Sequence, residues 1–305
     1  MKVHQGKLTG CLFLTVLIFI GCSPGRFLVN RLAGSLGSAG SIYLTENDPQ
    51  LVREAFPFNL KTIEMLLQQS PENPDLLTAA ASGFTMYSYA FILEDADRLA
   101  ATDISASRPV YQRAQHLLER GRDYGLQALE ARHPGFRDQF QANPESVVKA
   151  LDSEDILAAY WTAAAIGGAI AASKGHPALL IDLPKVGYLL ERALELDANW
   201  NGGALYGALM KYELSRPDQK ANADEVAQEY YRRARELSGG NDCSLYVAYA
   251  EAFSIRNQDR AEFEEMLTAA LKINVDEVPA LRLSNLLAQD RARWLLERID
   301  DLFYY

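Results

Sequence analysis

The chain has 305 residues, a formal net charge of −10 and 49% hydrophobic residues. This length is enough for one large domain or two small ones, and three cysteines are too few for a disulfide-dense scaffold. The acidic balance opposes binding to nucleic acid and to anionic lipid through long-range repulsion, so we expect no nucleic-acid partner.

Residues 1–21 have the pattern of a bacterial lipoprotein signal peptide. Two lysines near the start precede a run without charge at 11–20, which is too short to span a bilayer as a helix. Gly21 then directly precedes Cys22, and this order resembles a lipobox. We therefore expect cleavage before Cys22 and attachment of lipid to its thiol. An ordinary cleaved signal peptide with an incidental cysteine is the alternative.

The next segment, residues 22–41, is rich in Gly and Ser, as is typical of a flexible tether. We expect it to connect the lipid on Cys22 to a single helical-repeat domain at 42–305. The predicted location is the periplasm, with membrane contact only through the lipid anchor, and Ser23 favours the outer membrane by the usual sorting rule. Loss of the two signal lysines takes the net charge from −10 to −12. Cys243 would then be the only free thiol in an oxidising compartment, so we expect it to be buried.

Beyond residue 41 nearly all of the sequence predicts helix, and no stretch shows the alternation of polar and apolar residues that a strand requires. The pairs Asp48-Pro49 and Asn143-Pro144 each combine an N-cap residue with a proline suited to the first helical turn. Pro57 is expected to break or kink the helix over 49–69, because proline lacks the N–H of the helix ladder.

A repeat of helix pairs is indicated in the second half of the chain. Residues 188–199 resemble the end of a tetratricopeptide repeat, and a similar pattern recurs twice downstream. A small anchor residue, which lets neighbouring helices approach closely, recurs as Ala193, Ala234 and Ala270. Their separations are 41 and 36 residues, against about 34 in a standard unit, and a longer loop around 215–224 explains the first excess. We predict an all-α fold, a tetratricopeptide-like array of helix hairpins (an α-solenoid) with three to four or more repeats.

Residues 156–173 contain no charged side chain, so a membrane-spanning helix has to be considered. The run is rich in Ala and Gly rather than Leu, and it lies at the short limit of the roughly 20 residues that a span needs. We therefore predict a buried helix. Gly167 and Gly168 each cost about 1 kcal/mol of helix propensity relative to Ala, and close helix packing could offset that cost.

No motif predicts catalysis, a metal site or a cofactor, and we expect that the chain is not an enzyme. The histidines show no metal-ligand spacing, and no nucleophile elbow of the form Gly-x-Ser-x-Gly occurs. The acidic group of Glu94, Asp95 and Asp97 could attract a cation. It lacks the alternating ligands of an EF-hand, so a solvated helix end is the preferred interpretation.

Aromatic residues predict a recognition surface. If the helices stack as an array, the first helix of each pair lines its concave face. Tyr suits such a surface because its ring is apolar and its hydroxyl is polar. Packing in the core is the alternative for each of these side chains, since aromatic residues usually lie inside. The candidates for a ligand-binding or peptide-binding pocket are Tyr87, Trp161, Tyr206 and Tyr212.

Polar residues of the last predicted helix have two possible roles. Asn285 and Gln289 lie four residues apart and share one helix face. They could bond loop carbonyls of the adjacent repeat or face a partner, and the structural role is preferred. Arg291, Arg293 and Arg298 are expected to form a solvated rim.

Three parts of the chain carry a family resemblance: residues 48–61, residues 81–91, and residues 258–263 continuing to 282–292. Together they resemble the TatT family, the T component found with some TRAP (tripartite ATP-independent periplasmic) transporters. The resemblance implies a helical-repeat lipoprotein that pairs with the periplasmic solute-binding P component of its transporter. It also implies a homotrimer.

The aromatic residues suggest, in addition, a hydrophobic small-molecule ligand that this chain would hold or pass on. The alternative to a transport accessory is a stand-alone periplasmic lipoprotein that binds small molecules or lipid, or that serves as a protein scaffold.

Overall fold

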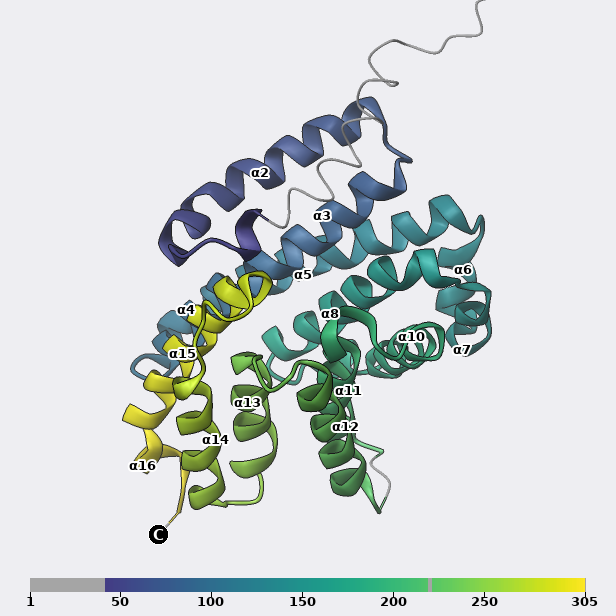
Figure 1. Cartoon of the computed structure of the whole chain (residues 1–305). Coiled ribbons are helices and arrows are strands. Elements are labelled where there is room, and N and C mark those ends of the chain that lie inside the picture. Colours follow the sequence, from purple (N-terminus) through teal and green to yellow (C-terminus); the bar gives the residue numbers. More distant parts are fainter. Residues whose placement is uncertain (1–41, 219–220, 305) are drawn as a thin grey trace, which may run out of the picture.

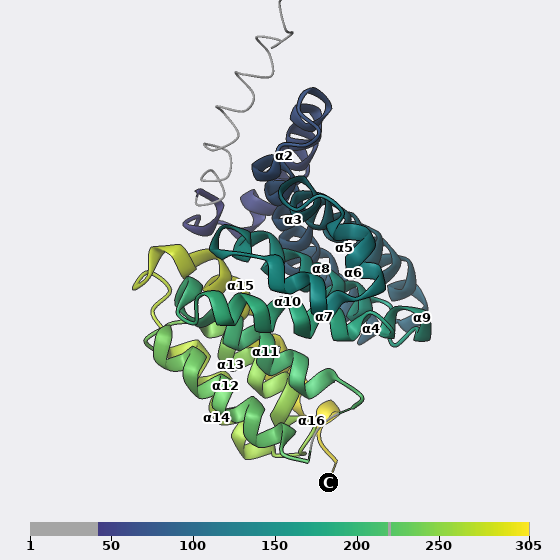
Figure 2. The ribbon, with the colours of Figure 1, turned by 90° about the vertical axis from the view of Figure 1, so that its right-hand side faces the viewer.

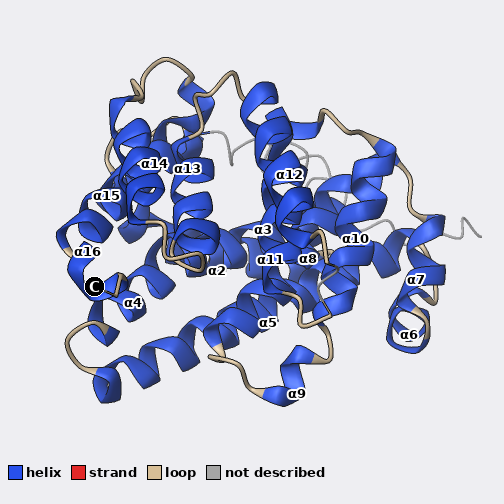
Figure 3. Ribbon diagram, turned by 90° about the horizontal axis from the view of Figure 1, so that it is seen from below, coloured by secondary structure: helices blue, strands red, loops and turns tan. Residues whose placement is uncertain are grey.

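A computed structural model describes residues 42–218 and 221–304. Every regular element within these residues is helical, as Figure 3 shows, so the predicted all-α class is confirmed. The signal peptide expected at 1–21 and the tether expected at 22–41, which contains Cys22, lie outside the described residues.

The helices follow one another through short connections (Figure 1). In chain order the α-helices are α2 (Pro49–Gln69), α3 (Pro74–Tyr87), α4 (Glu94–Ala100), α5 (Ile104–Arg132), α6 (Phe136–Ala142), α7 (Pro144–Val147), α8 (Ile156–Ala172), α9 (Pro177–Leu180), α10 (Leu183–Leu196), α11 (Ala204–Ser215), α12 (Ala223–Leu237), α13 (Cys243–Tyr249), α14 (Arg260–Lys272), α15 (Arg282–Glu297) and α16 (Ile299–Leu302). Two π-helical turns, η1 (Ser88–Leu93) and η5 (Ala250–Ser254), continue α3 and α13.

The helices pack into a curved ribbon whose last helices return to its first half (Figures 1 and 2). The largest group of buried side chains joins α2 through α11, and two smaller groups fill the space among α11 through α16. The three predicted anchor residues are all buried, on α10, α12 and α14 respectively: Ala193, Ala234 and Ala270. The longer connection expected around 215–224 is present between α11 and α12.

Both predicted N-caps are confirmed. Asp48 accepts hydrogen bonds from the backbone N–H groups of Gln50 and Leu51, each at 3.0 Å. Asn143 accepts one from the backbone N–H of Ser146 at 3.2 Å. These local bonds satisfy donors that a helix start otherwise leaves without partners.

Of the two outcomes expected at Pro57, the break is wrong, because α2 continues through it from Pro49 to Gln69, and the kink stays a prediction. Pro57 is exposed, so water can hydrate the carbonyl that loses its helical N–H partner. The other side of the helix packs against the rest of the fold and stabilises it across the proline. Its buried residues are Val52, Phe56, Leu60, Ile63 and Leu67.

The uncharged segment forms α8 at the centre of the ribbon (Figure 1). By length and composition, Ser153–Ala172 and the continuous rod Pro74–Ala100 could each cross a membrane. Their apolar windows are 67% and 61% buried inside the fold, respectively. Packing within the protein therefore accounts for their apolar character.

Glycines set how closely α8 approaches its neighbours. A Cβ atom on Gly125 of α5 would lie 2.1 Å from Oγ1 of Thr162 on α8. A Cβ atom on Gly168 would lie 2.8 Å from the Tyr89 ring, so close packing is confirmed at this glycine. Gly167 differs, because a Cβ there would meet nothing closer than Val186 at 3.9 Å.

Substitution of Gly125 by Ala is predicted to lower the free energy of unfolding by about 1–3 kcal/mol, the usual range for overpacking. Gly167→Ala on α8 is the matched control, and it should be neutral or stabilising by up to about 1 kcal/mol through helix propensity. Urea unfolding followed by circular dichroism measures both. Equal stabilities for the two variants would contradict the close approach of α5 and α8.

A buried carboxylate joins the end of α5 to the start of α8. Asp155, which ends the turn η3 (Ser153–Asp155), accepts hydrogen bonds from Nε of Arg132 at 2.6 Å and from the backbone N–H of Asp152 at 2.9 Å. Nε2 of His133 lies 2.7 Å from Oδ2 of Asp155, the oxygen that also accepts the bond from Asp152. Burial raises the pKa of Asp155, but the hydrogen bonds from Asp152, His133 and Arg132 outweigh burial and lower it.

Because its pKa is lowered in the folded state, Asp155 stabilises the fold above its unfolded pKa of about 3.9, and this contribution is lost as the pH falls through the folded value. We expect the wild-type urea midpoint to fall more steeply between pH 5 and pH 3 than that of Asp155→Asn. Parallel pH profiles for the two proteins would contradict this assignment.

The last helices are joined by the side chains predicted to act structurally. Asn285 accepts a hydrogen bond from the backbone N–H of Cys243 at 2.9 Å and donates one to the carbonyl of Asn241 at 2.8 Å. Gln289 donates to the carbonyl of Ala270 at 3.0 Å. Cys243 is buried as expected, and burial raises the pKa of its thiol to about 12.

Candidate functional site

One face of α8 carries apolar side chains that the fold leaves partly uncovered. Leu157, Tyr160, Trp161 and Ala164 follow the i, i+3, i+4, i+7 spacing and so lie on one side of the helix. Leu157 is 47% exposed, and the other three are half-buried. Because α8 contains no charged residue, this face offers apolar and aromatic contacts, and its polar groups are the Tyr160 hydroxyl and the Trp161 indole N–H.

Aromatic rings from α8 and from the turn before α11 pack together here. The ring centroids of Tyr160 and Trp161 lie 5.1 Å apart at an angle of 78°. Tyr160 also contacts Trp200, with centroids 5.0 Å apart. Trp200 begins the turn η4 (Trp200–Gly203), whose left-handed backbone at Asn201 bends the chain directly after the indole.

Tyr89 reaches the same face of α8 from the π-helical turn η1. Its ring lies against Gly168, and its hydroxyl donates a hydrogen bond to the carbonyl of Ala164 at 3.4 Å. The side chain is nevertheless 42% exposed. We call the following group of side chains the aromatic surface: Tyr89, Leu157, Tyr160, Trp161 and Trp200.

Both phenols of the aromatic surface stay neutral at ordinary pH. Burial, reinforced by the charge of Asp242, raises the pKa of Tyr160 to about 12. Burial likewise raises the pKa of Tyr89, and the neighbouring Tyr160 adds to the effect. A neutral surface of rings with a few polar atoms suits an apolar or aromatic solute better than an ion.

Two of the four residues predicted for a binding pocket lie in the core. Tyr87 is 7% exposed, and its ring lies 6.0 Å from that of Phe56. Tyr212 is 8% exposed, and its ring occupies the space that a Cβ atom on Gly187 would need. Their positions match the core-packing alternative stated for them.

The other two predicted residues are half-buried, and their rings contact different aromatic side chains, Tyr160 for Trp161 and Tyr230 for Tyr206. Trp161 belongs to the aromatic surface on α8. Tyr206 lies on α11, with its ring 6.0 Å from that of Tyr230 on α12.

Two residues of the aromatic surface, Trp200 and Leu157, are not among those predicted from the sequence. Leu157 could have been found from its four-residue spacing to Trp161, whereas no local pattern places Trp200 beside α8.

A pocket of 560 Å³ lies elsewhere, between α5, α6 and α10. Charged side chains of both signs dominate its lining. Among them, the ammonium of Lys185 donates hydrogen bonds to Gln141 at 2.6 Å and Asp182 at 2.7 Å. The lining of this pocket includes none of the four predicted residues.

Within the described part of the chain, no group of three or more His, Cys, Asp or Glu could hold a metal ion.

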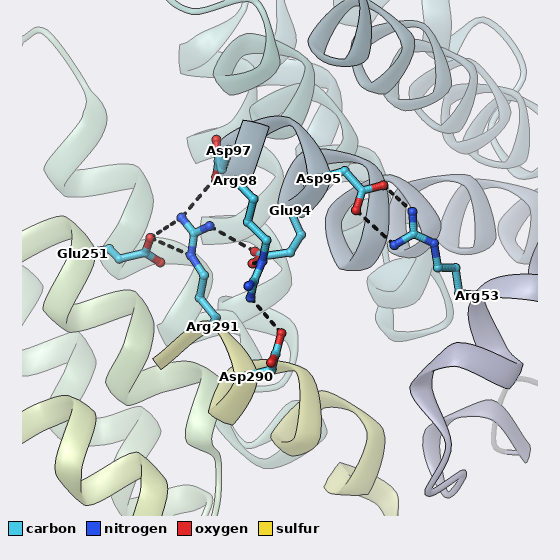
Figure 4. Close-up of polar contacts among 8 residues, drawn as sticks. All are labelled: Arg53, Glu94, Asp95, Asp97, Arg98, Glu251, Asp290 and Arg291. Atoms are coloured by element: carbon cyan, nitrogen blue, oxygen red, sulfur yellow. Dashed lines mark hydrogen bonds and ion pairs between the residues drawn. The ribbon is translucent and has the colours of Figure 1, made fainter. Parts of the chain in front are cut away.

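The acidic group on α4 is not a solvated helix end, so that expectation is wrong. Figure 4 shows its carboxylates pairing with arginines from distant parts of the chain. Nη1 of Arg291 lies 3.0 Å from Glu94, and its Nη2 lies 3.1 Å from Asp97 and 2.6 Å from Glu251 on η5. We call these four residues the Arg291 cluster. A separate pair joins Asp95 to Arg53 of α2.

The predicted solvated rim is also wrong at Arg291, whose side chain is only 16% exposed and lies over the Trp294 ring at 4.4 Å. Burial lowers the pKa of Arg291, but Glu251 and Glu94 outweigh burial and raise it, so the guanidinium stays charged. Arg298 packs on the same ring at 4.8 Å, while Arg293 is exposed as predicted.

Comparison with known proteins assigns this architecture to a family. Residues 45–303 match the family described as the TRAP transporter T-component. The match spans most of the chain, and the protein therefore belongs to this family, whose members are accessory components of transport systems rather than known enzymes. An uncharacterized protein of Treponema pallidum (strain Nichols) is 29% identical over 309 residues, which cover 95% of this chain and 96% of that relative.

Replacement of Arg291 by Met is predicted to lower the free energy of unfolding by about 2–3 kcal/mol. Loss of one partner from a fully buried pair costs about 3–5 kcal/mol, and the carboxylates here are partly exposed. Arg293→Met on the exposed side of α15 is the matched control, with an expected change below about 0.5 kcal/mol. Equal unfolding midpoints for both variants would contradict a stabilising role for the cluster.

Proposed function

We propose that this protein is a lipid-anchored periplasmic accessory component of a TRAP-type transport system, which docks the solute-binding P component. Family membership supports the accessory role. The order of charge, apolar run and Cys22 supports a signal peptide at 1–21 and a lipidated tether at 22–41. A single domain at 42–305 would then work beside the membrane.

We also propose that the domain is a tetratricopeptide-like array. The buried alanines at the three anchor positions support this, together with the packing of α11 on α12 and of α13 on α14. In such an array, successive helix pairs build an extended surface that suits a protein partner. The homotrimer that the family resemblance implies is part of the proposal.

The aromatic surface is the observation that carries a role in solute handling. A chain with a formal net charge of −10 keeps one partly exposed helix face free of charge and lined by Tyr and Trp. Burial of an apolar solute against these rings would be favourable through the hydrophobic effect. We propose that the surface holds such a solute or passes it to or from the docked P component.

Native mass spectrometry tests the docking. The Cys22→Ser variant, secreted together with the solute-binding protein of the same transport system, is expected to leave the membrane fraction and to form a complex of defined stoichiometry. The masses would also reveal a homotrimer. Free subunits or homo-oligomers without the partner would contradict docking, and a variant that still fractionates with membranes would contradict an anchor at Cys22.

A second candidate is a stand-alone small-molecule or lipid-binding lipoprotein, and the partly exposed aromatic surface is also the observation that favours it.

Under either proposed function, Trp161→Ala should weaken binding of a fluorescent hydrophobic dye by about 2 kcal/mol, or roughly 30-fold in Kd. Tyr206→Ala on α11 is the control, and its Kd should stay within about threefold of wild type. Equal losses in both variants would contradict the aromatic surface as the site.

A further inference from the structure

The outward face of α2 carries a row of large apolar side chains that the described residues leave mostly uncovered. Leu51, Phe58 and Met65 are 53%, 77% and 54% exposed, and each follows the last by seven residues, so they lie on one side of the helix. The buried residues of α2 lie on its other side, which packs against α3. In Figure 1, α2 is the outermost helix at its end of the ribbon, so the row points away from the protein.

No charge beside this row is free to select a charged partner. Glu54 and Lys61, which flank it, are of opposite sign, and both are engaged within the chain. Glu54 accepts a hydrogen bond from Nε2 of Gln50 at 2.7 Å, and Lys61 pairs with Glu64 at 2.5 Å. Complementary charges give a protein–protein contact its specificity, whereas a lipid surface needs only apolar area on the helix. The row therefore suits uncharged lipid better than a protein partner.

The described part of the chain begins beside α2. Ile42 is 68% exposed, and the ring of the next residue, Tyr43, lies 4.9 Å from that of Phe56 near the middle of α2. Because an α-helix rises about 1.5 Å per residue, each end of α2 lies within about 20 Å of Phe56. Whatever holds the chain before residue 42 is therefore connected to the domain at α2.

The lipid proposed for Cys22 limits how far α2 can lie from the bilayer. Residues 22–41 connect that cysteine to Ile42. A Gly- and Ser-rich chain of this length has a root-mean-square end-to-end distance of about 25 Å, and its full extension is about 70 Å. A face tethered over such a distance meets the bilayer at a high effective concentration, so a contact that would be weak in solution becomes populated.

We propose that the outward face of α2 lies on the bilayer that holds the lipid of Cys22, with Leu51, Phe58 and Met65 inserted among uncharged phospholipids. The inference rests on the anchor of the proposed function and adds a second membrane contact to it. The contact orients the domain: α2 lies along the membrane surface. At the opposite end of the ribbon in Figures 1 and 2, α14 points away from it.

Quenching by nitroxide-labelled lipids tests the contact. The lipidated full chain is placed in phosphatidylcholine vesicles with an environment-sensitive fluorophore on Phe58→Cys. Wild type should stay unlabelled, because lipid blocks Cys22 and Cys243 is buried. The Phe58 label should be blue-shifted and lose most of its fluorescence to these lipids. A nitroxide near the headgroup should quench it more than one at the chain end, because an interfacial helix lies about 5–10 Å into the headgroup/acyl boundary. The same label on Thr268→Cys of α14, which is exposed, should keep its fluorescence.

A charge at the centre of the row tests its apolar character. Phe58→Asp should abolish the quenching of a label on Met65→Cys, because the carboxylate would have to enter the lipid. Thr268→Asp is the matched control and should leave that quenching unchanged. Both substituted positions are exposed, so circular dichroism should show the same helix content in the two variants.

Flotation of the vesicles separates failure of this contact from failure of the anchor. Protein that floats while its Phe58 label is unshifted, or is blue-shifted without quenching because another protein surface covers it, would overturn the membrane contact and leave the anchor standing. Equal quenching at Phe58 and Thr268 would also overturn it. Wild type that does not float and is labelled at Cys22 would contradict the anchor, and the contact would be contradicted with it.

Discussion

The ion pairs of Arg291 hold the two ends of the helical ribbon together. Its guanidinium reaches Glu94 and Asp97 of α4, almost two hundred residues earlier in the chain, and Glu251 of η5 (Figure 4). Three carboxylates so close together repel one another. The guanidinium of Arg291 offsets that repulsion, together with Arg98 beside Glu94 at 2.5 Å and Lys174 beside Asp97 at 3.3 Å. In the curved ribbon of Figures 1 and 2, α15 otherwise packs mainly within the last group of helices, and its further links to the first half are the pair of Asp290 with Arg98 at 2.7 Å and the hydrogen bond from Arg282 to the carbonyl of Thr45 at 2.8 Å. We infer that the Arg291 cluster, the least exposed of these links, fixes the curvature.

The aromatic surface depends on a second constraint, the close packing of α8. Small residues let α5 and η1 approach one side of this helix, with Gly125 against Thr162 and Gly168 against the Tyr89 ring. The large side chains Tyr160 and Trp161 are thereby left on the side that no helix fully covers. A helix without charge can remain at the centre of an acidic protein because its backbone bonds are internal and its buried faces meet other apolar residues.

Features that depend on nearby residues could be predicted from the sequence. The N-caps at Asp48 and Asn143, and the burial of Cys243, follow from local bonds or apolar neighbours. Features that depend on distant partners could not be predicted. The acidic group of α4 is an example, because the residues near it in the sequence do not show that Arg291, almost two hundred residues later, pairs with it. Tyr87 ends α3 and continues its buried face, in phase with Ala80 and Phe84. The π-helical turn η1 that follows adds a residue to one helical turn, so the phase of α3 does not predict the exposure of Tyr89.

A distance measurement across the ribbon tests the central role of the Arg291 cluster most directly. Spin labels on the exposed positions Ser105 of α5 and Thr268 of α14, placed by cysteine substitution with Cys243 still buried, report the separation of the two halves by electron–electron double resonance. We predict one narrow distance distribution in the wild type and a broader, displaced one in Arg291→Met. Identical narrow distributions in the two proteins would show that the ribbon keeps its curvature without the cluster, which would contradict the account.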